Sequence, residues 1–258
     1  MKSPIALIGS ACHRIRQLRF TADSRSPLSA DALCATTVKE TARYTRWSPP
    51  HPLFTPWVGE SEFSAVYDGV APHTLVSVDR CYILASLALH AANLPGAFAE
   101  AGVFRGGTAL LLARIASRRQ RRLLLFDSFE GLPDPDPRHD NYYARGDFHA
   151  HETEVRDLLK DFAYSVEIHE GWIPGTFAGL GDELFSFVHV DVDLYTPALE
   201  CCRYFFPRLV FGGVMLFDDY GFPACRGEKD AVDEYFSGVQ DKPIVLHSGQ
   251  AFVLKAAG

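Results

Sequence analysis

The sequence has few cysteines, no long apolar run and no excess of positive charge, and each shortage excludes a class of protein. No apolar run approaches the ~20 residues that a helix needs to cross a bilayer. The opening residues 1–12 make a poor secretory signal because arginines follow closely. The 25 Lys and Arg residues against 32 Asp and Glu residues give a net charge of −7, which disfavours a nucleic-acid-binding surface. We therefore expect a cytoplasmic protein that binds neither nucleic acid nor a membrane.

The six cysteines show no metal-binding or disulfide pattern. The sequence contains no C-x-x-C pair and no His at zinc spacing near a cysteine. We expect all of them to be reduced thiols, as is usual inside the cell. They are Cys12, Cys34, Cys81, Cys201, Cys202 and Cys225.

The composition that remains is typical of a folded domain, with 47% hydrophobic and 22% charged residues. Prolines crowd residues 49–56, and proline fixes φ and removes a backbone donor, so we expect residues 1–73 to form an irregular extension. This extension could serve as a lid, as a wall of a ligand pocket or as a subunit contact, or simply pack its aromatic residues onto the main domain. Residues 74–258 form the predicted main domain.

Helical patterns alternate with short apolar runs after residue 74, which predicts an α/β fold with a mostly parallel sheet. Thr196 followed by Pro197 predicts an N-cap and the start of one helix. Residues 244–247 and 251–254 predict a closing hairpin, which brings the sheet to seven strands. Helices are expected over 77–93, 108–117, 152–162, 198–206 and 228–236, and the other strands over 97–102, 123–126, 166–169, 187–190 and 213–217. The helix over 77–93 carries apolar residues on more than one face, so we expect it to be substantially buried.

A glycine-rich turn, residues 100–108, separates a predicted strand from a helix and suits close approach of a ligand to the backbone. A P-loop is excluded because no Lys follows Gly107, and the glycine spacing does not fit a dinucleotide fold. An acidic residue before the first glycine would repel a pyrophosphate, so S-adenosylmethionine fits better. Glu100 and Gly102 would then cradle its methionine part, and Asp127 would bind the ribose. An ordinary β–α turn remains the alternative.

Acidic residues follow two neighbouring strands of the predicted sheet, at the edge where ligands bind in open α/β sheets. Asp191 follows one strand, and Asp218 and Asp219 follow the next, with no Lys or Arg interleaved. Oxygen ligands suit Mg²⁺ or another hard divalent cation, which would bind a substrate hydroxyl. Asp193 and His139 are the candidate proton acceptors. Alternatively, Asp218 and Asp219 only cap a turn.

Taken together, these motifs resemble the macrocin O-methyltransferase (TylF/MycF-type) family of S-adenosylmethionine-dependent enzymes. The resemblance covers about residues 74–236. It implies a class I methyltransferase, Rossmann-like sheet with helices on both faces, a Mg²⁺ held by Asp191, Asp218 and Asp219, and hydroxyls of sugars on secondary metabolites as substrates. The matching stretches are residues 100–107, 127–133, 171–172, 191–195 and 212–220.

Within that resemblance, individual positions match the family's cofactor site. Asp127 matches the ribose ligand, Ser128 and Trp172 lie where the adenine is held, and Thr74-Leu75 resembles the segment at the methionine end. The family usually has Thr-Met there, so Leu75 is a departure. The matching stretches also include Arg105, Gly106 and Gly171, which we count with the cofactor site.

A long irregular segment, residues 139–145, contains a histidine and two tyrosines and could form a lid or line an acceptor pocket. A solvated loop is the alternative.

Our leading hypothesis is a Mg²⁺-dependent O-methyltransferase that acts on a small hydroxyl-bearing metabolite, specifically a sugar of a glycosylated natural product, and assembles as a homo-oligomer. A nicotinamide-dependent oxidoreductase and a non-catalytic cofactor-binding protein are the alternatives.

Overall fold

The computed structural model describes residues 56–57 and 62–256 of the chain. Its α-helices are α3 (Glu62–Val70), α4 (Val78–Ala91), α5 (Gly107–Arg118), α6 (Glu152–Leu158), α7 (Tyr195–Arg208) and α8 (Arg226–Ser237). Its strands are β1 (Ala97–Ala101), β2 (Leu123–Asp127), β3 (Val166–Glu170), β4 (Phe185–Val190), β5 (Leu209–Phe217), β6 (Ile244–Val245) and β7 (Ala251–Leu254).

The strands form one seven-stranded sheet in the order β3-β2-β1-β4-β5-β7-β6. Strands β1 to β5 are parallel to their neighbours among these five, whereas β7 is antiparallel to both β5 and β6. The predicted mostly parallel seven-stranded sheet with its closing hairpin is therefore confirmed.

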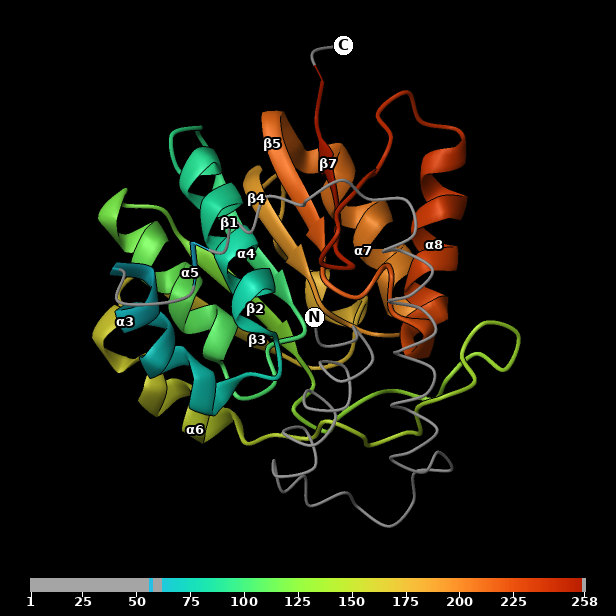
Figure 1. The fold of residues 1–258 in the computed structure, drawn as a ribbon, viewed down its shortest axis with the longest axis horizontal. Coiled ribbons are helices and arrows are strands. Elements are labelled where there is room, and N and C mark those ends of the chain that lie inside the picture. Colours follow the sequence, from blue (N-terminus) through green and yellow to red (C-terminus); the bar gives the residue numbers. More distant parts are fainter. Residues whose placement is uncertain (1–55, 58–61, 257–258) are drawn as a thin grey trace, which may run out of the picture. The chain divides into compact units, whose positions relative to one another are not determined.

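Helices cover both faces of the sheet (Figure 1). Strand β1 shows why, because its side chains alternate: Phe98 packs with α4 and α5, while Ala97 and Ala99 pack with α7 and α8 on the opposite face. All five residues of β1 are buried. Strands buried on both faces carry apolar residues throughout, which is why the central strands appear in the sequence as short continuous apolar runs.

Two local predictions are wrong. Helix α7 begins at Tyr195 with Leu194 as its N-cap residue, so Thr196 and Pro197 lie within the first turn, where a missing N–H costs no helical hydrogen bond. The predicted irregular extension also ends in a helix, α3. The crowded prolines stop at Pro56, so residues 62–70 contain no proline that would prevent a helix. Residues 1–55 and 58–61 lie outside the described part, and so does most of the predicted extension.

The helices and the cysteines bear on the expectations about membrane insertion and disulfide bonds. Within residues 56–57 and 62–256, no helix has both the length and the apolar character required to span a bilayer. The cysteines in this part of the chain, at positions 81, 201, 202 and 225, are free and buried.

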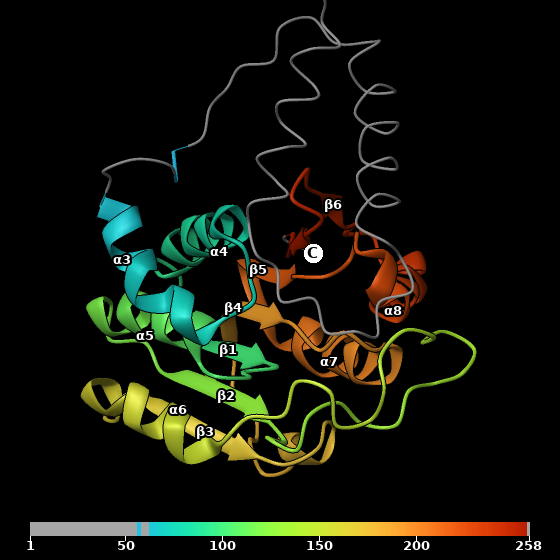
Figure 2. The same ribbon diagram turned by 60° about the horizontal axis from the view of Figure 1, so that its bottom comes forward.

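The parallel strands β1, β2 and β4 end at one edge of the sheet, and the loops that follow them meet there. Figure 2 shows the loop after β2 extending from this edge toward α7 and α8. This edge is where the candidate site lies.

Candidate active site

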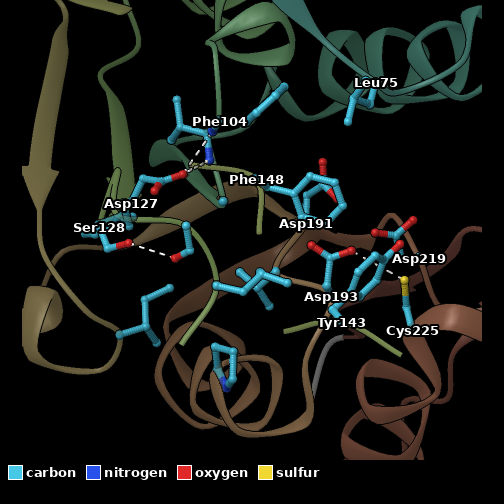
Figure 3. Close-up of a pocket in the computed structure, with 18 of the residues that line it drawn as sticks. Leu75, Phe104, Asp127, Ser128, Tyr143, Phe148, Asp191, Asp193, Asp219 and Cys225 are labelled. Carbon is cyan, nitrogen blue, oxygen red and sulfur yellow. Dashed lines mark hydrogen bonds between the residues drawn. The ribbon is translucent and has the colours of Figure 1, made fainter. Parts of the chain in front are cut away.

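A cavity of about 380 Å³ opens at the carboxyl edge of the sheet. Figure 3 shows Asp127 and Ser128 at one end and Asp193, Asp219 and Cys225 at the other. The lining combines apolar and aromatic walls with few polar groups, as small-molecule sites usually do. Its walls include Val103, Phe104, Leu132, Tyr143, Phe148, Trp172, Ile173 and Phe222.

The glycine turn after β1 brings backbone to the cavity at a position that only glycine tolerates. Gly102 has φ +85°, and a Cβ atom there would lie 1.8 Å from the carbonyl oxygen of Asp191. The ends of β1 and β4 can therefore approach each other only because residue 102 has no side chain. Gly102 lines the cavity.

Asp127 fastens this turn to the end of β2. Its Oδ2 accepts hydrogen bonds from the backbone N–H groups of Val103 and Phe104 at 2.7 and 2.9 Å, and its Oδ1 accepts one from Phe129 at 2.7 Å (Figure 3). A carboxylate held in this way is preorganised to accept further hydrogen bonds from a ligand in the cavity. The structure thus places Asp127 where the sequence predicts a ribose ligand.

The segment before α4 lies against the glycine turn. A Cβ atom on Gly107 would lie 2.7 Å from Cβ of Thr74, so this contact also requires glycine. Thr74 and Leu75 line the cavity, together with the predicted adenine-side residues Ser128 and Trp172 and the predicted cofactor-site residue Gly171. The structure brings these five predicted residues together.

Three residues predicted to bind the cofactor do not line the cavity, and their assignment to the cofactor site stays a prediction. Glu100 is completely buried and its Oε1 lies 2.8 Å from Nδ1 of His189. Arg105 is exposed and stacks over the ring of Phe104. Gly106 is buried against Val155 as the N-cap residue of α5. In an all-buried strand, an acidic residue finds a partner inside the sheet rather than a ligand at its end.

Three carboxyl groups form the other end of the cavity. Asp191, Asp193 and Asp219 all line it, and ligand atoms of Asp193, Asp219 and Cys225 lie within 4.8 Å of one another. Asp193 has an unusual φ of +61° and accepts a hydrogen bond from Cys225 Sγ at 3.4 Å. Such backbone strain is often concentrated at functional sites.

Asp218 does not line the cavity, and both of its oxygens have protein partners. Oδ1 accepts a hydrogen bond from Gln250 Nε2 at 2.7 Å and lies 3.5 Å from His189 Nε2, while Oδ2 pairs with Arg80 Nη1. The same Nη1 lies 2.9 Å from Asp219 Oδ1. The sequence therefore placed the three aspartates correctly at one edge, but an arginine from α4 lies between two of them.

Burial and mutual repulsion disturb the ionisation of these groups. Burial, and then repulsion from Asp218 and Asp219, raises the pKa of Asp191 well above its usual value. Burial and the neighbouring Asp219 raise the pKa of Asp193 to about 7. Burial opposes ionisation of Asp218 too, but His189, Arg80 and Gln250 outweigh it and hold the pKa of Asp218 below its usual value. The cluster thus contains more carboxyl groups than its cations neutralise.

This donor set fits a hard divalent cation. Asp191 and Asp219 offer carboxylate oxygens to the cavity, and ligand atoms of His189, Asp191 and Asp218 lie within 4.8 Å of one another. Oxygen-rich sites of this kind favour Mg²⁺, Ca²⁺ or Mn²⁺. Binding through Asp218 would require Arg80 to release one of its carboxylates, and the metal-ligand set remains a prediction.

His139, one of the two predicted bases, does not line the cavity. Its ring stacks on Tyr195 with centroids 3.9 Å apart, and its Nδ1 lies 3.0 Å from Asp230 Oδ2. The next residue, Asp140, accepts a hydrogen bond from the backbone N–H of Tyr195 at 3.1 Å. His139 and Asp140 therefore anchor the loop after β2 to α7 and α8, and the structure does not bring His139 to the cavity, so its catalytic role stays a prediction.

The same loop nevertheless contributes to the cavity. Tyr143 and Phe148 line it, and their rings pack edge to face at 5.0 Å. Tyr142 is largely exposed. Residues 139–145 therefore fit both interpretations in part: Tyr143 belongs to the wall of the pocket, whereas Tyr142 lies on a solvated part of the loop.

Arg80 is a residue of the cavity lining that sequence reasoning missed. It lies in the segment predicted as a substantially buried helix, and a buried arginine requires an ionic partner. That conflict was a usable signal. Its partners, Asp218 and Asp219, were identified at the end of a strand, but nothing in the sequence linked them to an arginine more than a hundred residues away.

Comparison with known proteins places this geometry in a family context. The family described as Macrocin-O-methyltransferase (TylF) matches residues 70–241. A tetracenomycin-C rhamnosyl 4'-O-methyltransferase of Streptomyces olivaceus is 28% identical over 63% of this chain and 67% of its own length. Demethyldecarbamoylnovobiocin O-methyltransferase of Streptomyces niveus is 32% identical over 55% of this chain and 59% of its own length. Mycinamicin III 3''-O-methyltransferase of Micromonospora griseorubida is 27% identical over 67% of this chain and 75% of its own length.

Solved structures share the fold. The O-methyltransferase NovP matches with a TM-score of 0.63 at 23% identity, covering 86% of this chain and 98% of NovP. TomG of Streptomyces achromogenes, an O-methyltransferase solved in complex with SAM, matches with a TM-score of 0.51 at 19% identity over 78% and 92% of the two chains. At these identities the likeness establishes the class I methyltransferase fold that the sequence predicts.

Proposed function

Since this chain belongs to the macrocin-O-methyltransferase (TylF) family, and is thereby an O-methyltransferase, we propose that it transfers a methyl group from S-adenosylmethionine to a sugar hydroxyl of a glycosylated natural product. The family resemblance predicted from the sequence is confirmed. The acceptor class follows from the relatives, whose names describe methylation on rhamnosyl-tetracenomycin, a novobiocin precursor and mycinamicin.

One observation carries the proposal: a single cavity joins the Asp127 end to the end formed by Asp191, Asp193 and Asp219. A methyl donor bound along the glycine turn and an acceptor bound against the carboxyl groups would thus be in contact within one continuous cavity. Holding two reactants in such an arrangement is itself a large part of catalysis.

The residues at the donor end would bind S-adenosylmethionine and orient it. The carboxylate of Asp127, fixed by three backbone N–H groups, would accept hydrogen bonds from the ribose hydroxyls. Trp172 and Ser128 would border the adenine, and Thr74 and Leu75 the methionine end. Bound S-adenosylmethionine supplies the electrophilic methyl group.

The residues at the acceptor end hold and move a proton. Asp193 lines the cavity, so its carboxylate is the group positioned to take the proton from the acceptor hydroxyl. Asp191 and Asp219 would hold a Mg²⁺ ion together with Asp218, and a bound divalent cation lowers the pKa of the hydroxyl that approaches it. Tyr143, Phe148 and Phe222 would form the apolar walls against the sugar and exclude water.

The direct test is methyl transfer from S-adenosylmethionine carrying a deuterated methyl group to a panel of glycosides, detected by mass spectrometry. We expect a labelled O-methyl group on a sugar hydroxyl, and turnover that falls with a chelator and returns with Mg²⁺. No transfer to any glycoside, with full transfer to a non-sugar hydroxyl, would refute the acceptor class. Transfer unchanged by a chelator would refute the metal.

The same chain offers a test against the oxidoreductase alternative. A ligand that binds only the folded state raises the melting temperature by mass action. We expect S-adenosylmethionine to raise it and NAD to leave it unchanged, because the backbone N–H groups of Val103 and Phe104 at the glycine turn are bonded to the carboxylate of Asp127 and are not free to bind a pyrophosphate.

A further inference from the structure

We propose that Arg80 occupies the place of a cation between Asp218 and Asp219, so that its charge sets how tightly the carboxyl cluster takes a divalent cation. The inference rests on the proposed function, because it concerns the metal that this function would use. It assigns Arg80 as a positioning residue rather than a catalytic one.

The guanidinium of Arg80 is held from several sides. Its Nη1 pairs with Asp218 Oδ2 and, at 2.9 Å, with Asp219 Oδ1. Its Nε lies 3.4 Å from Ser77 Oγ, and its Cζ lies 4.7 Å from the ring centroid of Phe222. Arg80 is only 9% exposed, yet it lines the cavity. A single nitrogen thus bridges two carboxylates, as a bound metal ion would.

The remaining charges show why the bridge matters. His189 faces the other side of Asp218, at 3.5 Å, and its second nitrogen pairs with Glu100. Asp218 is therefore compensated twice, by Arg80 and by His189. Asp219 shares Arg80, and among the described residues no cation is paired with Asp191 or Asp193. Among the described residues, the carboxyl groups without a cation of their own are therefore Asp191, Asp193 and Asp219, which lie on the side of the cluster that faces the cavity.

A divalent cation bound at this side would lie close to Arg80. The two positive charges would repel each other across a poorly solvated cluster, where such interactions are strong. A cation that also used Asp218 would have to displace Nη1 from Oδ2. In either case the positive charge of Arg80 weakens cation binding while it keeps Asp219 in place. A purely structural arginine would have no such effect on metal affinity.

The test measures Mn²⁺ binding to the full chain by electron paramagnetic resonance of the free ion, without any acceptor. We would compare the wild type with Arg80→Gln, Arg80→Met and the charge-conserving Arg80→Lys. The matched control is Arg122→Gln, because Arg122 also bridges two carboxylates, Glu167 and Glu183, but on the exposed surface. Circular dichroism and thermal unfolding identify the variants that fold.

We expect the neutral Arg80 variants to bind Mn²⁺ at least about tenfold more tightly than the wild type. Arg80→Lys and Arg122→Gln should stay within about threefold of it, because the first keeps the charge and the second lies away from the cluster. Unchanged or weaker binding in the neutral variants would overturn the proposal. So would the absence of Mn²⁺ binding from every folded form.

The wild type supplies a readout that needs no variant. Bound Mn²⁺ should broaden the Arg80 Nε–H resonance by paramagnetic relaxation, and a sharp resonance with Mn²⁺ bound would place the cation elsewhere and overturn the proposal. Methyl transfer by the wild type is assayed separately. Intact transfer with a failed metal result would refute this inference and leave the methyltransferase function standing, whereas absent transfer would count against that function alone.

Discussion

Glu100 and His189 form a completely buried pair beneath the cavity: Glu100 Oε1 lies 2.8 Å from His189 Nδ1, and neither side chain is exposed. The other imidazole nitrogen lies 3.5 Å from Asp218 Oδ1. Burial disfavours the charged imidazolium, but the two carboxylates outweigh it and raise the pKa of His189 to about 9. His189 is therefore a positive charge inside the sheet at neutral pH.

This pair predicts a pH-dependent contribution to stability. The folded-state pKa of His189 lies above its unfolded value, so the stabilisation is complete below about pH 6.5 and disappears as the pH rises through about 9. His189→Gln should lower the free energy of unfolding by on the order of 2–3 kcal/mol at pH 6 and by much less at pH 9.5. Urea unfolding of both proteins at the two pH values measures this. An equal loss at both would show that His189 contributes through packing.

Gly102 gives a prediction about backbone geometry, with a control in the same chain. Gly102→Ala would place Cβ 1.8 Å from the carbonyl oxygen of Asp191 and should cost more than about 3 kcal/mol or prevent folding. Gly146 has the same φ of +85° but no atom within 4 Å of a Cβ, so Gly146→Ala should cost only about 1 kcal/mol. Thermal unfolding compares them. Similar losses would mean that the close approach of β1 and β4 is unimportant.

The fold was predictable because its signals are local. Apolar runs and helical periodicity located the elements of the sheet domain, and Asp127 and Asp191 were identifiable because they lie at the carboxyl ends of buried strands. The failures have a common cause, which is that they depend on partners distant in sequence. Glu100 turns inward because His189 lies beside it on the neighbouring strand, at the register position opposite it.

The same reasoning explains His139 and Arg80. His139 has the chemistry of a base, but Tyr195 and Asp230 hold it away from the cavity, and neither is adjacent in sequence. Arg80 was expected to lie in a buried helix, and only the folded chain supplies the carboxylates that make its burial tolerable. Residue type indicated the possible chemistry, while the long-range packing decided which residues reach the site.

Asp127 gives a prediction about cofactor affinity. Asp127→Asn replaces one oxygen acceptor by a donor where three backbone N–H groups converge, so S-adenosylmethionine affinity should fall by about a hundredfold. Asp134→Asn is the matched control, since Asp134 is 77% exposed and pairs with Arg145 at the surface. Isothermal titration with S-adenosylmethionine measures both. An Asp127→Asn protein that binds as the wild type does would remove Asp127 from the cofactor site.

The two residues that the sequence offered as bases should behave oppositely. Asp193 lines the cavity, whereas the ring of His139 is packed on Tyr195 and bonded to Asp230. Removing a general base typically costs a factor of 10²–10⁴ in rate, so Asp193→Asn should lower kcat by about that much and leave S-adenosylmethionine affinity unchanged. His139→Gln should change kcat by less than about fivefold, because it only loosens the anchor of the loop. Steady-state kinetics with titration of the methyl donor measures both quantities. A larger loss of kcat in His139→Gln than in Asp193→Asn would mean that the loop moves His139 into the cavity when an acceptor binds, and that the base lies on the loop rather than after β4.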